Sequence, residues 1–389
     1  MQNVCFLFGA GADNNYEQQL PEGEEFAKAL LLDKEFDKTI NAFYQGRINE
    51  RLANSNEKEK EWLPAVFKPA KLSVDSLYKA SIKKEYASMV NGKELMANDF
   101  KRMEMLTLAD KEDKISKKPN YMNQIDGRMH TLIWPRAYGY TSFCAVVSLY
   151  TRAYLTLCTK LFSKSPEDLL KDFSDISENL NGLPDKSTSS YYKIIKDHLV
   201  KEQFEEKDYI RIVTTNYTPF AEKVIGTKAI SYPHGKLGWF ESPYHLEVFD
   251  ASDPGDKPKI DTEFVFPYIF LQSGVKPIVD PKQIDEYTKT KEYIIGSDIL
   301  FICGYGINDD DNHINSILRH RITHETQSRI TVYIHYQKEG KGDAKKEKEN
   351  LLDKLRISDK SISSFMVEII NADFEDQNDR FLEIIKRYC

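Results

Sequence analysis

Two polar residues that follow short strand-like runs are the candidates for chemistry in this sequence. Asn216 follows the run Arg211–Thr215, and His234 lies further on in the run Ser231–Gly235, which reads Ser-Tyr-Pro-His-Gly. A neutral amide can hold a water molecule or a hydroxyl, because it offers both a donor and an acceptor. An imidazole, with an unperturbed pKa near about 6.5, can accept a proton from a hydroxyl at neutral pH. We interpret Asn216 and His234 as a catalytic pair, against the simpler alternatives of a turn Asn and a packed His.

Two glycine turns are predicted to bind the phosphates and riboses of a dinucleotide. One follows the apolar run Val4–Phe8, and the other follows Asp298–Cys303. Glycine lets the backbone turn tightly and approach a phosphate. If both runs are strands of one parallel sheet, both turns lie at its carboxyl edge, where such ligands bind. The residues predicted to bind the dinucleotide are Gly9, Ala10, Gly11, Ala12, Asp13, Thr215, Gly304, Tyr305, Gly306 and Asn308. Of these, Thr215 does not belong to a glycine turn but directly precedes Asn216.

The first turn differs from the one that hydride-transferring enzymes use. Their fingerprint requires a third glycine where this chain has Asn14, and an acidic residue about 20 positions further on, after a second strand. Here that stretch is predicted to be helical, which disfavours a dehydrogenase. Asp13 has three open interpretations: it caps a helix, accepts hydrogen bonds from ribose hydroxyls, or holds a loop.

The elements around these residues predict an α/β fold. Strands of a mostly parallel, Rossmann-like sheet are expected at Val4–Phe8, Tyr209–Thr214, Asp298–Cys303, Ile330–Tyr336 and Met366–Asn371. Helices are expected at Pro21–Leu32, Asp310–His320 and Asp376–Tyr388. Further helix-like segments at Lys34–Asn54, Glu57–Phe67, Tyr138–Phe162 and Ser190–Phe204 predict a large helical insertion, residues 33–205, within one α/β domain, residues 1–389.

Two segments carry weaker patterns. Lys236–Thr290 is rich in Pro, Asp and aromatic residues and is interpreted as irregular, with one candidate strand at Glu263–Gln272. Lys338–Asn350 is highly charged and is interpreted as a loop or helix cap.

The bulk composition limits the class of protein. The formal net charge is −7, so the chain has no general attraction to nucleic-acid phosphates. Its five cysteines are scattered, with no CxxC pair, which is typical of reduced thiols in a cytoplasmic protein. We see neither a signal peptide nor an apolar run of about 18 residues, so no membrane association is expected.

Four motifs, each at a predicted strand end, resemble those of the sirtuin-like family, and specifically its bacterial anti-phage NADase branch. They are Gly9–Ala12, Thr214–Tyr217, Pro233–Gly235 and Cys303–Asp310. The resemblance implies NAD as the substrate, cleaved to nicotinamide and ADP-ribose during abortive infection. It implies that Asn216 positions a water molecule or the ribose and that His234 is the base. No zinc is expected, because the four-cysteine module of deacetylating sirtuins is missing.

The resemblance also implies partners. Stand-alone sirtuin-like proteins of about this length, with a helical insertion, are similar to those encoded beside a HerA-type hexameric ATPase, and the segment Asp126–Tyr138 resembles that subgroup. Such proteins assemble as rings, so a homo-oligomer is expected, with nucleic acid contacted only through the partner. An Argonaute-linked system is the next alternative.

Other functions stay open at this point. The chain could be a non-catalytic sensor of NAD or ADP-ribose, and sequence alone does not separate a sensor from an active enzyme. A deacylase is disfavoured by the missing zinc cysteines. The acidic run Asp309–Asp311 could hold a divalent metal with His313, as in a nuclease, but we expect ordinary capping of a helix there and no metal.

Overall fold

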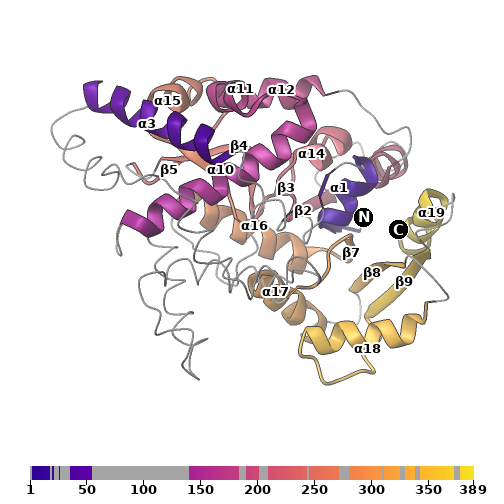
Figure 1. Cartoon of the computed structure of the whole chain (residues 1–389). Helices are drawn as coiled ribbons and strands as arrows, with labels where there is room; N and C mark the ends of the chain where they lie inside the picture. The colour runs from indigo at the N-terminus through magenta and orange to yellow at the C-terminus, as the bar shows by residue number, and fades with distance from the viewer. Residues whose placement is uncertain are drawn as a thin grey trace, which may run out of the picture. The chain divides into compact units, whose positions relative to one another are not determined.

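Figure 1 shows the computed structural model of the chain, which describes residues 2–17, 20–21, 26, 36–54, 140–183, 190–200, 209–242, 245–270, 280–308, 311–324, 329–337, 342–371 and 377–389. The chain divides into two compact units, and each is made of segments that are distant in sequence. The first unit contains residues 1–20, 184–236 and 281–389, and the second contains residues 21–183 and 237–280.

The first unit is built on a six-stranded sheet in which every neighbouring pair of strands is parallel. Its strands are β1 (Val4–Phe8), β2 (Ile210–Thr214), β3 (Ile230–Ser231), β7 (Ile299–Cys303), β8 (Ile330–Gln337) and β9 (Phe365–Asn371). They lie in the order β3-β2-β1-β7-β8-β9. Phe8 is in register with Thr214 on one side and Cys303 on the other, so β1, β2 and β7 end at the same edge.

Both faces of this sheet are covered by helices, and its two central strands, β1 and β7, are accordingly apolar and buried along their whole length. Cys5 and Leu7 point to one face and belong to an apolar cluster that includes Ile314 and Leu351. Phe6 points to the other face, where its ring stacks on that of Phe301 with 5.1 Å between centroids. The described helices of this unit are α1 (Ala10–Tyr16), α13 (Tyr191–Ile195), η3 (Lys196–Val200), α14 (Phe220–Ile225), α16 (Pro281–Gly296), α17 (Asn312–Thr323), α18 (Ala344–Lys354) and α19 (Gln377–Tyr388).

The predicted α/β fold with a mostly parallel sheet is confirmed. The predicted strands match β1, β2, β7, β8 and β9 to within a few residues, and the two predicted C-terminal helices match α17 and α19. The structure also contains a helix that the sequence did not predict: α1 begins at Ala10, inside the glycine motif itself. Most of the predicted helix Pro21–Leu32 lies outside the described residues, as does all of Glu57–Phe67.

The second unit combines helices with a small three-stranded sheet. Its helices are α3 (Phe36–Asn54), α10 (Tyr140–Phe162), α11 (Pro166–Lys171), η2 (Phe173–Asp175), α12 (Ile176–Gly182) and α15 (Lys257–Thr262). The sheet contains β4 (Gly235–Ser242), β5 (Glu247–Asp250) and β6 (Phe266–Ile269) in the order β5-β4-β6. Arg47 on α3 links the two segments of this unit, residues 21–183 and 237–280. Its guanidinium donates to the carbonyl oxygens of Ile260 and Glu263 at 2.7 and 3.1 Å.

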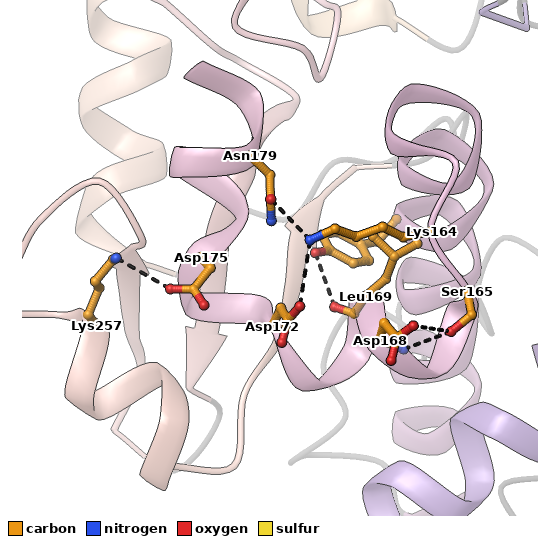
Figure 2. A network of polar contacts seen from close by, with 9 residues as sticks. Lys164, Ser165, Asp168, Leu169, Asp172, Asp175, Asn179 and Lys257 are labelled. Atoms are coloured by element: carbon orange, nitrogen blue, oxygen red, sulfur yellow. Dashed lines mark hydrogen bonds and ion pairs between the residues drawn. The ribbon is translucent and has the colours of Figure 1, made fainter. Parts of the chain in front are cut away.

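A polar network stabilises the turn between α10 and the short helices that follow it (Figure 2). Ser165 caps α11, accepting a hydrogen bond from the N–H of Asp168 at 3.2 Å. The Lys164 ammonium lies 3.1 Å from Oδ1 of Asn179 and 3.6 Å from a carboxylate oxygen of Asp172. This network holds α11 and α12 to the end of α10, so it serves the architecture of the second unit.

Two segments carry more regular structure than the sequence predicts. Lys236–Thr290 was interpreted as irregular apart from one candidate strand at Glu263–Gln272, which is confirmed by β6. The segment also contains most of β4, all of β5 and α15, and the first part of α16. Lys338–Asn350 contains the start of α18, whose N-terminus is capped by Asp343. Charged residues and prolines interrupt the apolar pattern of these segments, and their apolar runs are short. The pattern therefore did not predict the elements other than β6. The proposed single domain with an insertion at 33–205 stays a prediction. The second unit also includes residues 237–280.

None of the helices within the described ranges is long and apolar enough to cross a membrane.

Candidate active site

The two predicted glycine turns pack directly against each other. The N–H of Gly9 donates to the carbonyl oxygen of Cys303, and the N–H of Gly11 donates to that of Gly304, both at 3.1 Å. A Cβ atom on Gly9 would lie 2.5 Å from the Gly304 oxygen. A Cβ atom on Gly304, whose φ is +64°, would lie 2.3 Å from the Ala12 nitrogen. The close contact between the two turns is therefore enough to require glycine at positions 9 and 304, whether or not a ligand is bound.

This packing changes how the first turn could bind phosphate. The N–H groups of Gly9 and Gly11 already donate across to the second turn, and that of Ala12 donates to the Gly9 oxygen at 2.9 Å. Ala10 is exposed at the start of α1. A phosphate that bound here would contact Ala10 at the surface. Gly9, Gly11 and Ala12 would lie beneath it and support the turn.

The second turn is fixed by its own side chains. The Tyr305 hydroxyl donates to Oδ1 of Asn315 at 3.1 Å, and Asn315 donates to the Asn308 carbonyl oxygen at 2.7 Å. Tyr305 is 3% exposed and belongs to the apolar cluster beneath the sheet, whereas Gly306 and Asn308 are exposed. Of these three predicted ligand-binding residues, Tyr305 therefore supports the turn, and Gly306 and Asn308 face solvent.

Asn216 lies where the sequence predicted it, directly beyond the carboxyl end of β2. Its side-chain nitrogen donates to the Gly9 carbonyl oxygen at 2.9 Å, and its side chain is buried. The preceding residue, Thr215, extends the pairing of β1 and β2, since its N–H donates to the Phe8 oxygen at 3.0 Å. The amide is thus held against the first glycine turn.

Asp13 holds the elements around this turn together. Its carboxylate accepts hydrogen bonds from the Tyr192 hydroxyl on α13, at 2.5 Å, and from the Thr218 hydroxyl. Burial raises its pKa to about 6, against the opposing effect of the hydrogen bonds from Thr218, Tyr192 and Asn216. The N-cap of α1 is Gly9, so Asp13 does not cap this helix. Of its three interpretations, holding a loop matches these contacts.

His234 lies in a cluster that the sequence did not reveal. Its Nε2 atom is 3.1 Å from Nε2 of His313 and 3.2 Å from Oδ1 of Asp311. His234 follows β3, whereas Asp311 and His313 open α17, which follows β7. Two strands, β2 and β1, separate β3 from β7 in the sheet. The sequence analysis grouped Asp311 with His313 but did not predict that His234 lies beside them. That contact depends on the conformations of loops that follow different strands of the sheet.

The run Asp309–Asp311 was expected to cap α17, and of its three residues the structure describes Asp311. It occupies the N-cap position, but its side chain makes no capping hydrogen bond. Its carboxylate instead approaches His234 and also lies near two phenols. Burial raises the pKa values of Tyr217 and Tyr287, and the nearby charge of Asp311 also acts to raise both. Tyr217 directly follows Asn216. The Asn216 loop and the imidazole cluster therefore both lie at the carboxyl edge of the sheet.

Comparisons with known proteins give structural neighbours only. No family model matches the chain, and no curated protein matches it. Among solved structures, it is similar to Sir2Af2 bound to a myristoylated histone peptide, with 11% identity, a TM-score of 0.30, and coverage of 56% of this chain and 80% of that one. It is also similar to a mutant Sir2 homologue in complex with ADP-ribose, at 12% identity and a TM-score of 0.33, covering 58% of this chain and 77% of that one. Likeness at this level says nothing about ligand or activity.

Proposed function

We propose that this chain is an NAD glycohydrolase that cleaves NAD to nicotinamide and ADP-ribose. The observation that carries the proposal is the Asn216 amide, buried at the carboxyl edge of a parallel sheet and hydrogen-bonded to the first glycine turn at 2.9 Å. Dinucleotides bind at this edge in open α/β sheets. The four sequence motifs that resemble those of the sirtuin-like family all contribute residues to this carboxyl edge of the sheet.

The reaction assigns a distinct task to each polar group. Breaking the bond between nicotinamide and ribose leaves positive charge on the sugar, as in glycoside hydrolysis. The Asn216 oxygen holds the ribose or the attacking water without adding a full charge. His234 takes a proton from a ribose hydroxyl or from the water. Water supplies oxygen to the ribose carbon, nicotinamide leaves with the bonding electron pair, and one proton is released.

The test is a comparison of NAD cleavage by purified variants. We expect Asn216→Ala and His234→Ala each to lower the rate by at least about 100-fold, the usual scale for loss of an acid–base group. Thr227→Val is the matched control. Thr227 is also buried and donates to a backbone carbonyl, that of Ile210 at 3.1 Å, but at the opposite end of β2. Full NAD turnover by folded Asn216→Ala and His234→Ala would refute the proposal.

A second candidate is a sensor that binds NAD or ADP-ribose without cleaving it. It is favoured by the cluster around His234, since the same Nε2 atom that would act as a base already lies within hydrogen-bonding distance of His313 and Asp311. Calorimetry separates the two functions. A sensor binds ADP-ribose and leaves NAD intact, whereas the enzyme releases nicotinamide.

We also propose a role in anti-phage defence, with a homo-oligomer that assembles with a HerA-type ATPase. The support for this is the resemblance of the sequence motifs, together with the need to restrain an enzyme that depletes NAD in its own host. Co-purification of the chain with such an ATPase, followed by measurement of the mass of the complex, tests the assembly directly.

A further inference from the structure

The cluster of His234, Asp311 and His313 offers three metal-ligating atoms. The two Nε2 atoms and one carboxylate oxygen all lie within 4.8 Å of one another. We propose that these three side chains bind a divalent transition-metal ion such as Zn²⁺. Imidazole and carboxylate are the ligands that such ions take in proteins. The site shares His234 with the proposed catalytic pair, and its Nε2 atom can be either base or ligand at one time, but the test below does not depend on NAD cleavage.

The distances fit a small coordination sphere. In a tetrahedral site with bonds of about 2.0–2.1 Å, neighbouring ligand atoms lie about 3.3 Å apart. The Nε2 of His234 lies 3.1 Å from that of His313 and 3.2 Å from the Asp311 oxygen. The two imidazole rings are tilted by 48° and not stacked, with their Nε2 atoms closer than their centroids, which lie 5.2 Å apart. Both distances are within a few tenths of an ångström of the tetrahedral value, and all three ligand atoms lie within 4.8 Å of one another.

The ligands are held in place by the fold. Asp311 and His313 are two positions apart at the start of α17, and the Asp311 side chain is not used to cap that helix. The His313 and Tyr287 rings pack edge to face, with 5.2 Å between centroids and 82° between planes. The side chains of His234 and Asp311 are 7% and 11% exposed. A buried carboxylate beside two imidazoles is electrostatically satisfied by a cation.

Three protein ligands would leave a further coordination position open. Metal sites of this kind bind water or a ligand group there, whereas purely structural zinc sites are closed by four protein ligands. The alternative without a metal is a hydrogen-bonded chain from one imidazole through the other to Asp311. The two arrangements differ in one measurable property, the affinity of the cluster for a metal ion.

Cobalt spectroscopy on the full chain tests the proposal without reference to NAD cleavage. The protein is stripped with a chelator and titrated with Co²⁺, whose visible d–d bands report tetrahedral coordination. We expect one Co²⁺ per chain and displacement of the bands by Zn²⁺. His313→Ala and Asp311→Ala should each weaken binding by at least about 100-fold, because even groups that only orient ligands are worth about 10–100-fold.

The matched control is His320→Ala. His320 and His324 form a second histidine pair near the end of the same helix, with stacked rings 4.4 Å apart. They are exposed and could bind metal on their own. The proposal predicts an unchanged spectrum for His320→Ala. Bands that persist in His313→Ala, bands lost in His320→Ala, or no bands in the wild-type chain would each overturn it. His313→Gln and Asp311→Asn, which preserve size, replace any alanine variant that does not fold.

Discussion

Asp13 is a buried carboxyl whose affinity for protons differs between the folded and the unfolded chain. Burial raises its pKa from 3.8 to about 6. Between these values the folded chain binds more protons than the unfolded chain, so the free energy of unfolding decreases as pH rises from about 4 to about 6, and then levels off. At about 1.36 kcal/mol per pKa unit, the contribution of Asp13 falls by about 3 kcal/mol across this window.

The measurement compares urea unfolding of the wild-type chain and Asp13→Asn at a series of pH values. Asn has nearly the same size and does not titrate, so shared contributions from other groups cancel. We expect the wild-type chain to lose stability relative to Asp13→Asn as pH rises to about 6. Parallel stability curves would show that Asp13 titrates in the folded chain as it does in the unfolded chain.

At the scale of elements, the contact between the two glycine turns sets a strict requirement on Gly304. Gly304→Ala would strain a positive φ and drive a Cβ atom to 2.3 Å from the Ala12 nitrogen and 2.7 Å from the Gly11 carbonyl carbon. Neither atom can move without moving α1. We expect a loss of at least about 3 kcal/mol in the free energy of unfolding.

The matched control is Gly46→Ala. Gly46 lies inside α3, it is exposed, and a Cβ atom there would meet nothing within 4 Å. Alanine is the better helix former, so this variant should gain about 0.5–1 kcal/mol. Thermal unfolding of both variants checks the pair. A mild effect of Gly304→Ala would mean that the two turns separate readily.

Arg321 forms hydrogen bonds that link the segment before β7 to the start of β8 in the parallel sheet. Arg321 is 1% exposed, and its guanidinium donates to the carbonyl oxygens of Ser297 and Ile330 at 2.9 and 3.0 Å, and to the Thr331 hydroxyl at 2.9 Å. Arg321→Met keeps the apolar stem but leaves these buried acceptors unsatisfied, so we expect a loss of at least about 3 kcal/mol. Arg319→Met, on the same helix and exposed, should change stability by less than about 0.5 kcal/mol. Urea unfolding of both variants provides the comparison, and equal stabilities would contradict this role.

Four of the five strands predicted for the parallel sheet share one property, and the edge strand β9 is the exception. β1, β2, β7 and β8 are short and apolar and lie in the interior of the sheet, so their sequences stand out from the polar segments around them. β5 has the burial pattern exposed, intermediate, buried, intermediate, and its four residues carry little apolar signal. Asn216 was placed correctly because it follows such a strand directly. The partners of His234 were missed because they depend on a contact between loops that follow distant strands.

At the scale of the whole molecule, the proposed function predicts control by a partner. An unrestrained NADase would deplete the cell that makes it, so we expect the isolated chain to cleave NAD slowly. A hundredfold activation requires the partner to favour the active state by about 2.7 kcal/mol, at about 1.4 kcal/mol per factor of ten. The test measures NAD cleavage per chain for the protein alone, with a HerA-type ATPase, and with the ATPase plus DNA. Equal rates in all three would exclude this form of control.

The position of β1 also affects how the chain is made. This strand lies between β2 and β7, and Val4 is in register with both Ile210 and Ile299. Both neighbours are synthesised long after β1 has left the ribosome. At about 5–20 residues per second, β1 waits about 15–60 s for the second of them. For about the first two thirds of that interval, until β2 is made, the fully apolar β1 has no neighbouring strand to pair with, so the nascent chain is a target for chaperones that shield exposed apolar segments.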